Sequence, residues 1–251
     1  MSHFPCTYFG NKRQEVKEFE RYLLRPETKT IIEPFAGSCA VSFYLNQKYP
    51  GRFNFIAYDS SPEVIRIYEA LGKIDGDFYT QELIDAIAGI MKTVAWRHGR
   101  KNKTTETKFT KRQLEFIKFI KSDNFKFIGA DWKTDIYELA SKPENSIFLD
   151  PPYFDSYNQC YFTETKIFKQ VGNNSALSMD LTFIFCEICE LFKKGGDANI
   201  LMVSSSVSIL RYIFRDFIAH AYEVTTGISC LKIDGKFCKK QRHHIVVTNW
   251  K

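Results

Sequence analysis

Short runs rich in β-branched and aromatic residues alternate along the chain with longer runs in which apolar residues recur every three or four positions. Such an alternation of strands and helices is typical of a sheet with helices wound on both of its faces. The chain has no internal repeat and no low-complexity segment. The pattern predicts an α/β fold with seven strands, at Thr30–Phe35, Phe53–Asp59, Phe125–Asp131, Ser146–Asp150, Asn199–Ser204, Tyr222–Ile228 and His244–Trp250.

Two segments near the C-terminus carry a helical period. Apolar residues recur at this period within Leu181–Phe192, and the pair Gly195-Gly196 supplies a stop for the helix. A second run of apolar residues with helical spacing lies within Ile209–Phe217. We therefore predict a helix over each of these segments.

Residues 75–124 interrupt the rhythm of strands and helices. They are typical of a mostly helical insertion with a polar, charged loop at Arg97–Lys108. We predict a main sheet domain made of residues 1–74 and 125–251, and a small insertion domain made of residues 75–124. The insertion is expected on the loop side of the sheet, where α/β proteins bind ligands.

The positive charge of the chain is concentrated in the insertion. The chain has 35 Lys and Arg residues against 29 Asp and Glu residues, a net charge of +6. The thirty residues from Arg97 to Lys126 hold ten basic and three acidic residues, a net charge of +7, so the other 221 residues sum to −1. A localised basic stretch suits a polyanion, because each neutralised phosphate releases counterions. A solvated helix face with a Lys-rich loop is the alternative.

Composition excludes several classes of protein. With 251 residues, 44% hydrophobic and 25% charged, the chain has the ordinary globular mix. No apolar run reaches about 18 residues, which excludes a membrane-spanning helix, and the N-terminus lacks the pattern of a secretion signal. The seven cysteines are expected to be reduced thiols. Cys186 and Cys189 have no second cysteine pair at ligand spacing, so we predict no metal site.

The first candidate site is the turn after the first predicted strand, within Ile31–Ser38. Gly37 allows a tight turn and a close approach of the backbone to a ligand. Asp59 stands 22 residues after Gly37, at the end of the second strand, where an acid is placed to bind ribose hydroxyls. A single glycine is not the G-x-G-x-x-G that a pyrophosphate needs, which disfavours NAD and FAD and leaves S-adenosylmethionine. A plain structural turn is the alternative.

The second candidate site is the sequence Asp150-Pro151-Pro152-Tyr153, which directly follows a buried strand. Four specified residues occur by chance on the order of once in a thousand chains of this length. The two prolines stiffen the backbone and remove two N–H donors, so the Asp150 carboxylate and the Pro151 carbonyl can both accept hydrogen bonds at one point. An exocyclic amino group offers two N–H donors to such a pair, and a base could stack on Tyr153. A strand-terminating turn is the alternative.

In the order of these motifs the chain resembles the Dam-type, alpha-group adenine-N6 DNA methyltransferases. The cofactor motif comes first, then the insertion, then Asp-Pro-Pro-Tyr. The resemblance implies a Rossmann-like mixed seven-stranded sheet with helices on both faces, S-adenosylmethionine as cofactor and double-stranded DNA as partner. The segments that carry it are Tyr8-Phe9-Gly10-Asn11-Lys12, Glu33-Pro34-Phe35-Ala36-Gly37, Asp59, Gly129-Ala130-Asp131-Trp132, Asp150-Pro151-Pro152-Tyr153 and Val247-Thr248-Asn249-Trp250.

The resemblance also implies a role for each matching position. Tyr8 and Lys12 would line the mouth of the site, and Asp59 would hold the cofactor's ribose. Asp131 would meet the adenine amino group of the cofactor, with Trp132 packed on that ring. The full set of implied cofactor-binding residues is Tyr8, Lys12, Glu33, Phe35, Ala36, Gly37, Asp59, Asp131, Trp132 and Asp150. The implied catalytic residues are Asp150, Pro151, Pro152 and Tyr153.

DNA would be bound by basic residues of the insertion, and the target adenine would be flipped out of the duplex. The implied DNA-binding residues are Arg97, Arg100, Lys101, Lys103, Lys108, Lys111 and Arg112. Such an enzyme is expected in the cytoplasm or wherever its target DNA lies. Adenine in RNA and cytosine N4 in DNA are alternative substrates, and a catalytically inactive nucleic-acid-binding relative is a third possibility.

Two departures from the family pattern leave further questions open. The insertion lacks the Arg-Phe-Asn and Asn-x-Pro-Phe-Gly patterns of GATC readers, so the target sequence and a partner restriction nuclease are undetermined. The oligomeric state is also open, with a homodimer as one alternative. His243 and His244 stand where the family has an acid, and we expect them to cap or flank the last strand.

Overall fold

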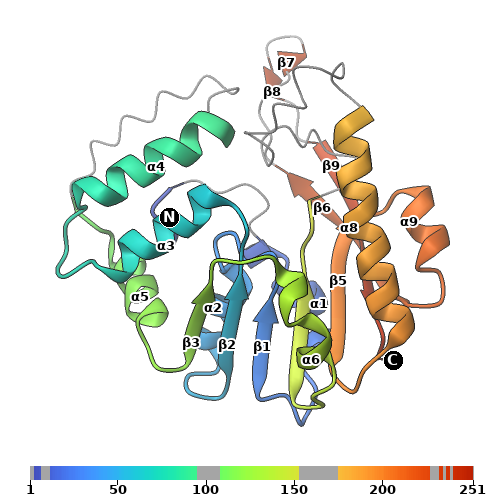
Figure 1. Ribbon diagram of the computed structural model, residues 1–251. Helices are drawn as coiled ribbons and strands as arrows, with labels where there is room; N and C mark the ends of the chain where they lie inside the picture. The colour runs from blue at the N-terminus through green and yellow to red at the C-terminus, as the bar shows by residue number, and fades with distance from the viewer. Residues whose placement is uncertain are drawn as a thin grey trace.

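The computed structural model describes residues 3–6, 12–94, 108–152, 175–226, 232–233, 236–237 and 240–250. At its centre lies a seven-stranded sheet in the order β3-β2-β1-β4-β5-β9-β6 (Figure 1). The strands are β1 (Thr30–Glu33), β2 (Asn54–Tyr58), β3 (Phe125–Ile128), β4 (Asn145–Leu149), β5 (Asn199–Ser205), β6 (Ile218–Thr226) and β9 (Lys240–Thr248). Two further short strands, β7 (Lys232–Ile233) and β8 (Lys236–Phe237), pair with each other.

The sheet is mixed, as predicted. The strands from β3 to β5 run parallel, whereas β9 pairs antiparallel with both β5 and β6. All seven predicted strands are confirmed. β1 ends at Glu33, earlier than predicted, because Pro34 has no N–H with which to continue the ladder. β6 begins at Ile218 and β9 at Lys240, both earlier than predicted, because their mutual pairing extends beyond the apolar alternation that marks a strand in the sequence.

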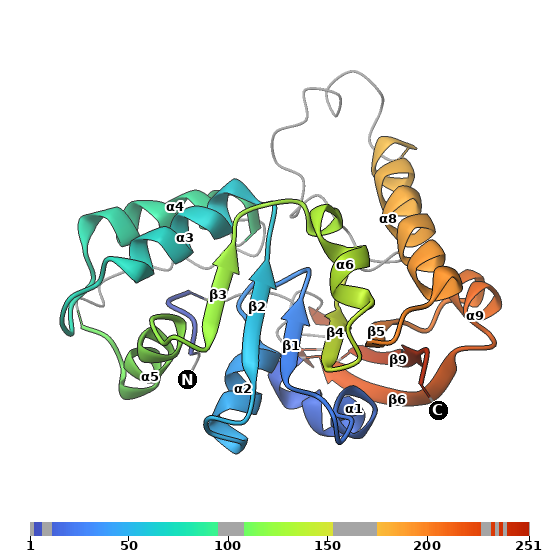
Figure 2. The same ribbon diagram turned by 60° about the horizontal axis from the view of Figure 1, so that its bottom comes forward.

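Side chains of successive strand residues alternate between two cores, one on each face of the sheet. In β2, Phe55 and Ala57 belong to one core, whereas Ile56 and Tyr58 contact the other. The first core also contains residues of α1 (Val16–Leu23), α2 (Ala40–Lys48), α3 (Pro62–Gly72), α4 (Gln81–Val94) and α5 (Lys111–Ile120). The second contains residues of α6 (Ile136–Ala140), α8 (Ser175–Lys194) and α9 (Ser208–Ile213). Figures 1 and 2 show these helices on both faces of the sheet.

The helix predicted over Leu181–Phe192 is confirmed as α8, and it ends where the glycine pair predicts. Gly195 has a positive φ of 66°, and its N–H donates to the Leu191 carbonyl at 3.1 Å. Gly196 packs against Ala140, and a Cβ at this position would lie 2.2 Å from the Ala140 carbonyl oxygen. Within the described residues, no helix is both long and apolar enough to cross a bilayer.

The prediction of a helix over Ile209–Phe217 is correct only as far as Ile213, where α9 ends. Ile209 and Ile213 are 48% and 39% exposed, so their spacing does not mark a buried helix face. Phe214 is buried, and Phe217 packs on Phe192 with ring centroids 5.3 Å apart. These two aromatic residues enter the core from the connection to β6, not from a helix.

In its described parts the predicted insertion is largely helical, and both α4 and α5 pack into the first core of the sheet domain. α5 follows Thr110, whose side chain forms a capping box with Gln113. Phe116 and Phe119 of α5 belong to the first core, and the Phe119 ring lies 5.2 Å from the Phe55 ring of β2. Most of the charged loop predicted at Arg97–Lys108 lies outside the described residues. A separate recognition domain over residues 75–124 therefore stays a prediction.

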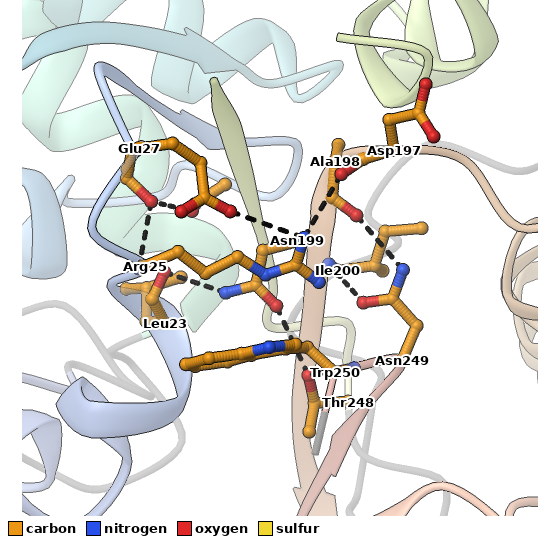
Figure 3. Close-up of polar contacts among 12 residues, drawn as sticks. Leu23, Arg25, Glu27, Asp197, Ala198, Asn199, Ile200, Thr248, Asn249 and Trp250 are labelled. Carbon is orange, nitrogen blue, oxygen red and sulfur yellow. Dashed lines mark hydrogen bonds and ion pairs between the residues drawn. The ribbon is translucent and has the colours of Figure 1, made fainter. Parts of the chain in front are cut away.

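Buried asparagine contacts join the two ends of the chain at the amino edge of the sheet (Figure 3). Asn199, at the start of β5, donates to the carbonyls of Tyr22 and Leu23 at 2.7 and 2.8 Å. Its Oδ1 accepts a hydrogen bond from the Thr248 hydroxyl at 3.3 Å. One buried side chain thus ties α1, β5 and β9 together.

The C-terminal residues complete the same edge (Figure 3). Asn249 donates to the Ala198 carbonyl at 3.0 Å and accepts from the Ile200 N–H at 2.8 Å, which extends the pairing with β5 beyond β9. The Arg25 guanidinium lies over the Trp250 ring at 5.2 Å. The C-terminal motif therefore stabilises the edge of the sheet opposite to the carboxyl ends of the parallel strands.

We expect Asn199→Ala to lower the free energy of unfolding by about 2–4 kcal/mol, because two carbonyls at the end of α1, one buried and one partly buried, lose their donor. Urea denaturation measures the change. Asn54→Ala, an exposed asparagine at the start of β2, is the matched control and should change stability by less than about 0.5 kcal/mol. Equal effects of the two substitutions would contradict the structural role of Asn199.

Candidate active site

The carboxyl ends of β3, β2, β1 and β4 meet at one edge of the sheet, which the arrowheads of β1, β2 and β3 mark in Figure 2. β1 pairs with β2 on one side and with β4 on the other, so the chain crosses over in opposite directions at this point. Open α/β sheets bind ligands at such a switch point. The predicted residues Gly37, Asp59, Asp131 and Asp150 each follow one of these strands, so the parallel pairing brings them to one edge.

The turn after β1 and the end of β2 are joined by hydrogen bonds. Gly37 has a φ of 48°, and its N–H donates to Asp59 Oδ2 at 2.9 Å. Asp59 Oδ1 accepts from the Ser61 N–H at 2.9 Å, and the Ala36 N–H donates to the Tyr58 carbonyl at 2.9 Å. The two residues that the sequence separates by 22 positions are therefore in direct contact.

The geometry of this turn fits a cofactor with an adenosine end and no phosphates. The Gly37 N–H is already bonded to Asp59, so it is not available to a pyrophosphate, which the Asp59 carboxylate would also repel. Each Asp59 oxygen can accept a second hydrogen bond, as from a ribose hydroxyl. Burial raises the pKa of Asp59 to about 6, against the backbone N–H groups of Ser61 and Gly37, which lower it. These residues fit S-adenosylmethionine better than a dinucleotide.

Trp132 and Phe35 pack together on the same edge, with ring centroids 5.4 Å apart. Trp132 is buried and lines a shallow hollow of about 190 Å³ together with Lys133, Phe183, Ile184 and Glu187. Asp131 is exposed, and its Oδ1 accepts from the Lys133 N–H at 3.0 Å. Asp131 thus caps the short 3₁₀ turn η3 (Trp132–Thr134) and leaves its second oxygen, Oδ2, toward solvent and Lys133.

Glu33 has a structural contact within the site. It is buried, and its Oε1 accepts from the Ser42 N–H in the first turn of α2 at 2.7 Å. The N-cap residue of α2, Cys39, makes no side-chain capping bond, so Glu33 satisfies an N–H that the helix leaves open. Burial raises the pKa of Glu33 to about 7, although the Ser42 hydrogen bonds oppose the rise. Its predicted contact with the cofactor stays a prediction.

Asp150 forms a buried ion pair directly after β4. Lys12 Nζ lies 2.8 Å from Asp150 Oδ2, and the two side chains are 3% and 18% exposed. Lys12 belongs to the 3₁₀ turn η1 (Lys12–Gln14) that precedes α1. Burial raises the pKa of Asp150 to about 6, and Lys12 opposes this rise. The structure therefore joins the N-terminal motif and the Asp-Pro-Pro-Tyr motif through two charged side chains.

Two further acceptors after β4 have no hydrogen-bond partner in the part of the chain that the structure describes. Within the described residues, no hydrogen bond reaches Asp150 Oδ1 or the Pro151 carbonyl. Pro151 is buried and Pro152 is half-buried. The other two predicted residues of this region, Tyr153 and Tyr8, lie outside the described part of the chain.

Sequence reasoning missed three side chains beside this ion pair. Glu15 Oε2 accepts from the Tyr222 hydroxyl at 2.9 Å and lies 2.9 Å from His244 Nδ1. His244 was expected to cap or flank the last strand, but it lies inside β9 and is 2% exposed. The sequence offers two signals for this cluster: Lys12 and Glu15 are three residues apart, and His244 directly precedes an apolar strand segment. Neither signal indicates that the two segments meet.

The predicted DNA-binding residues are described only in part. Arg97, Arg100, Lys101 and Lys103 lie outside the described residues. Lys108 and Lys111 are exposed, and Arg112 is half-buried. A shallow hollow of about 290 Å³ is lined by Arg13, Gln47, Lys111, Arg112 and Glu115. Two buried guanidinium nitrogens of Arg112 have no hydrogen-bond partner among the residues that the structure describes.

Metal-ligating clusters are absent from the described part of the chain, where no three His, Cys, Asp or Glu side chains gather closely enough to hold an ion. Cys186 and Cys189 are free thiols on α8.

The sequence of this chain is similar to a protein family and to a known protein. Residues 8–98 match the family model of the D12 class N6 adenine-specific DNA methyltransferases. The Retron Ec67 DNA adenine methylase of Escherichia coli is 22% identical over 261 residues, covering 87% of this chain and 83% of the relative. The chain is thus similar to N6 adenine-specific DNA methyltransferases over residues 8–98 and to one DNA adenine methylase over most of its length, which supports a methyltransferase as the class of protein.

Solved structures with a similar fold include methyltransferases from distant sources. The N-terminal domain of human METTL16 in complex with SAH is 11% identical, with 95% of this chain and 68% of that chain covered and a TM-score of 0.43. The precorrin-6y C5,15-methyltransferase of Geobacter metallireducens GS-15 is 12% identical, with 95% and 88% covered and a TM-score of 0.42. By its own strand order and pairing, the mixed seven-stranded sheet with helices on both faces is the Rossmann-like fold that the resemblance implies.

Glu33 should make the stability of the protein fall as the pH rises. Its pKa is raised in the folded state to about 7, so its stabilising contribution is complete below its ordinary pKa of 4.5 and is lost as the pH rises through 7. Glu33→Gln removes this titration and keeps an oxygen for the Ser42 N–H.

We therefore expect the melting temperature of Glu33→Gln, relative to the wild type, to increase between about pH 5 and about pH 8. Thermal melts across this range measure the difference. Glu27→Gln, at an exposed position, is the control. A difference between Glu33→Gln and the wild type that does not change with pH would contradict the burial of a titrating carboxyl.

Proposed function

We propose that this chain is a Dam-type DNA methyltransferase that transfers the methyl group of S-adenosylmethionine to N6 of adenine at a specific short sequence. The observation that carries the proposal is the pair of available acceptors after β4. Asp150 Oδ1 and the Pro151 carbonyl have no partner within the described residues, one strand away from the Gly37–Asp59 contact. A primary amine presents two N–H donors to two such acceptors.

The residues around Gly37 would hold the cofactor. Asp59 would accept hydrogen bonds from the ribose hydroxyls with the lone pairs that Gly37 and Ser61 leave open. Asp131 and Trp132 would contact the adenine ring, since they follow β3, the strand next to β2. When bound, S-adenosylmethionine supplies a methyl group on a positively charged sulfur.

Asp150 and Pro151 would make the target amine nucleophilic. The lone pair of an adenine amino group is delocalised into the ring, and two acceptors favour a pyramidal nitrogen that keeps its lone pair. Asp150 and Pro151 would thereby keep the lone pair of this nitrogen available to the methyl group that the cofactor would supply. The methylated nitrogen releases its proton to solvent. Asp150 acts by position and by negative charge as positive charge develops on nitrogen.

The target base would leave the double helix to reach these acceptors. Asp150 is largely buried at the sheet edge, and a base stacked inside a duplex presents no amine to such a position. Tyr153 would stack on the flipped base. Lys108, Lys111 and Arg112 would contact phosphates together with the basic residues of the preceding loop.

Analysis of the methylated product tests the function. The purified protein is incubated with labelled S-adenosylmethionine and with DNA or RNA, and the nucleosides are separated after digestion. We expect N6-methyladenine from DNA. N4-methylcytosine or methylated RNA would favour the alternative substrates, and no product together with no cofactor binding would favour an inactive relative.

Asp150→Ala should lower the rate of methyl transfer at least about a hundredfold, because it removes an acceptor from the reacting nitrogen. Thermal melting should show that this variant is still folded. Asp123→Ala, at an exposed position before β3, is the matched control and should keep wild-type turnover. Wild-type turnover by Asp150→Ala would refute the proposed role of this carboxylate.

Replacing Lys111 and Arg112 by glutamine should make DNA binding less dependent on salt, by an amount that corresponds to the loss of about one to two phosphate contacts. The measurement is the slope of log Kd against log salt concentration. The control pair is Lys29→Gln with Lys193→Gln, two exposed lysines at the amino edge of the sheet. An unchanged slope in the first variant would exclude this helix end from the DNA surface.

A further inference from the structure

A second buried carboxylate lies behind the Lys12–Asp150 ion pair. Glu15 is the residue before α1, and its N–H donates to the Lys12 carbonyl at 2.8 Å. Its side chain is only 12% exposed. Glu15 acts electrostatically on Lys12 and on Asp150, so a single lysine faces two acids in a largely buried place.

Two side chains of the antiparallel strands hold Glu15 in position. Tyr222 of β6 and His244 of β9 lie directly opposite each other in the ladder, so both side chains point to the same face of the sheet. Both contact Glu15 Oε2 at 2.9 Å. Burial acts to raise the pKa of Glu15, but the His244 hydrogen bond and Lys12 outweigh it and the pKa is lowered, so the carboxyl is ionised at neutral pH.

The charges explain what Glu15 does for Asp150. A lysine paired with one buried carboxylate would neutralise it and weaken it as an acceptor. With Glu15 present, Lys12 is shared between two carboxylates and neutralises Asp150 less completely, so Asp150 is more basic and is a stronger hydrogen-bond acceptor. Electrostatic effects of this kind are strong in a buried site, because water screens them little.

We propose that Glu15, held by Tyr222 and His244, is a positioning residue that balances the charge of Lys12 and thereby keeps Asp150 a strong acceptor for the substrate amine. This inference rests on the function proposed above. Glu15 does not touch the reacting atoms, and it acts electrostatically on Lys12 and on Asp150.

The pH dependence of the reaction separates this role from a structural one. Asp150 is faced by Lys12 of η1, Glu15 before α1, Glu33 of β1 and His244 of β9. Glu15 raises the pKa of Asp150 and Lys12 lowers it. Glu15→Gln should therefore move the acid limb of the kcat profile to lower pH, and Lys12→Met should move it to higher pH. A loss of packing alone would not move the two limbs in opposite directions.

The rate at neutral pH gives the second measurement. We expect Glu15→Gln to lower kcat on the order of tenfold, less than the roughly hundredfold loss from a direct stabilising contact, with an unchanged KM for DNA. Glu15→Asp keeps the charge and should retain the wild-type acid limb. His244→Gln should also lower kcat, as Glu15→Gln does. His243→Gln is the matched control, because His243 is exposed and pairs with Glu223 at 3.4 Å.

A carbon-13 NMR titration measures the effect of Glu15 on the Asp150 pKa without substrate. The Asp150 carboxyl resonance is assigned by its disappearance in Asp150→Asn. A lower Asp150 pKa in Glu15→Gln supports the proposal, and an unchanged pKa with wild-type kcat overturns it. If the wild type makes no N6-methyladenine, the proposed function fails, whereas the NMR result still decides whether Glu15 controls Asp150. Thermal melting and calorimetry with S-adenosylmethionine confirm that each variant is folded.

Discussion

Parallel pairing of β1 with β4 is the constraint on which the candidate site depends. Parallel strands end at the same edge, so the Gly37 turn after β1 and Asp150 after β4 become neighbours although more than a hundred residues separate them. β2 and β3 add Asp59 and Asp131 on the same edge. The opposite edge is closed by Asn199 and Asn249, whose hydrogen bonds hold the ends of β5 and β9. The hydrogen bonds of the asparagines thus stabilise one edge, and the proposed site lies at the other.

The carboxyl edge collects acidic side chains that are buried at a cost. Burial raises the pKa of Asp59 and Asp150 to about 6 and that of Glu33 to about 7. Each of the three has a partner that offsets part of this cost: backbone N–H groups for Asp59 and Glu33, and Lys12 for Asp150. Removing a partner from such a group leaves an uncompensated buried charge. Acids with raised pKa values that gather in one place are typical of functional sites.

Much of the fold and part of the site could be predicted from the sequence. The seven strands, the α8 helix and its glycine stop follow from local patterns that the structure keeps, because burial of apolar faces imposes them. Strand ends were less predictable. β9 extends back to Lys240 because β6 pairs with it, and the helix over Ile209–Phe217 stops at Ile213 because its apolar residues are divided between solvent and core.

The sequence by itself determined which chemical groups the candidate site contains: the Gly37 turn, the acid after β2, and an aspartate followed by two prolines that carry no N–H. These are properties of single segments, and each depends on covalent structure. Only the tertiary structure decided which charges meet. Lys12 with Asp150, and Glu15 with Tyr222 and His244, join segments from both ends of the chain. Such contacts depend on strand order and on which residues face each other across a sheet, and no local pattern encodes either.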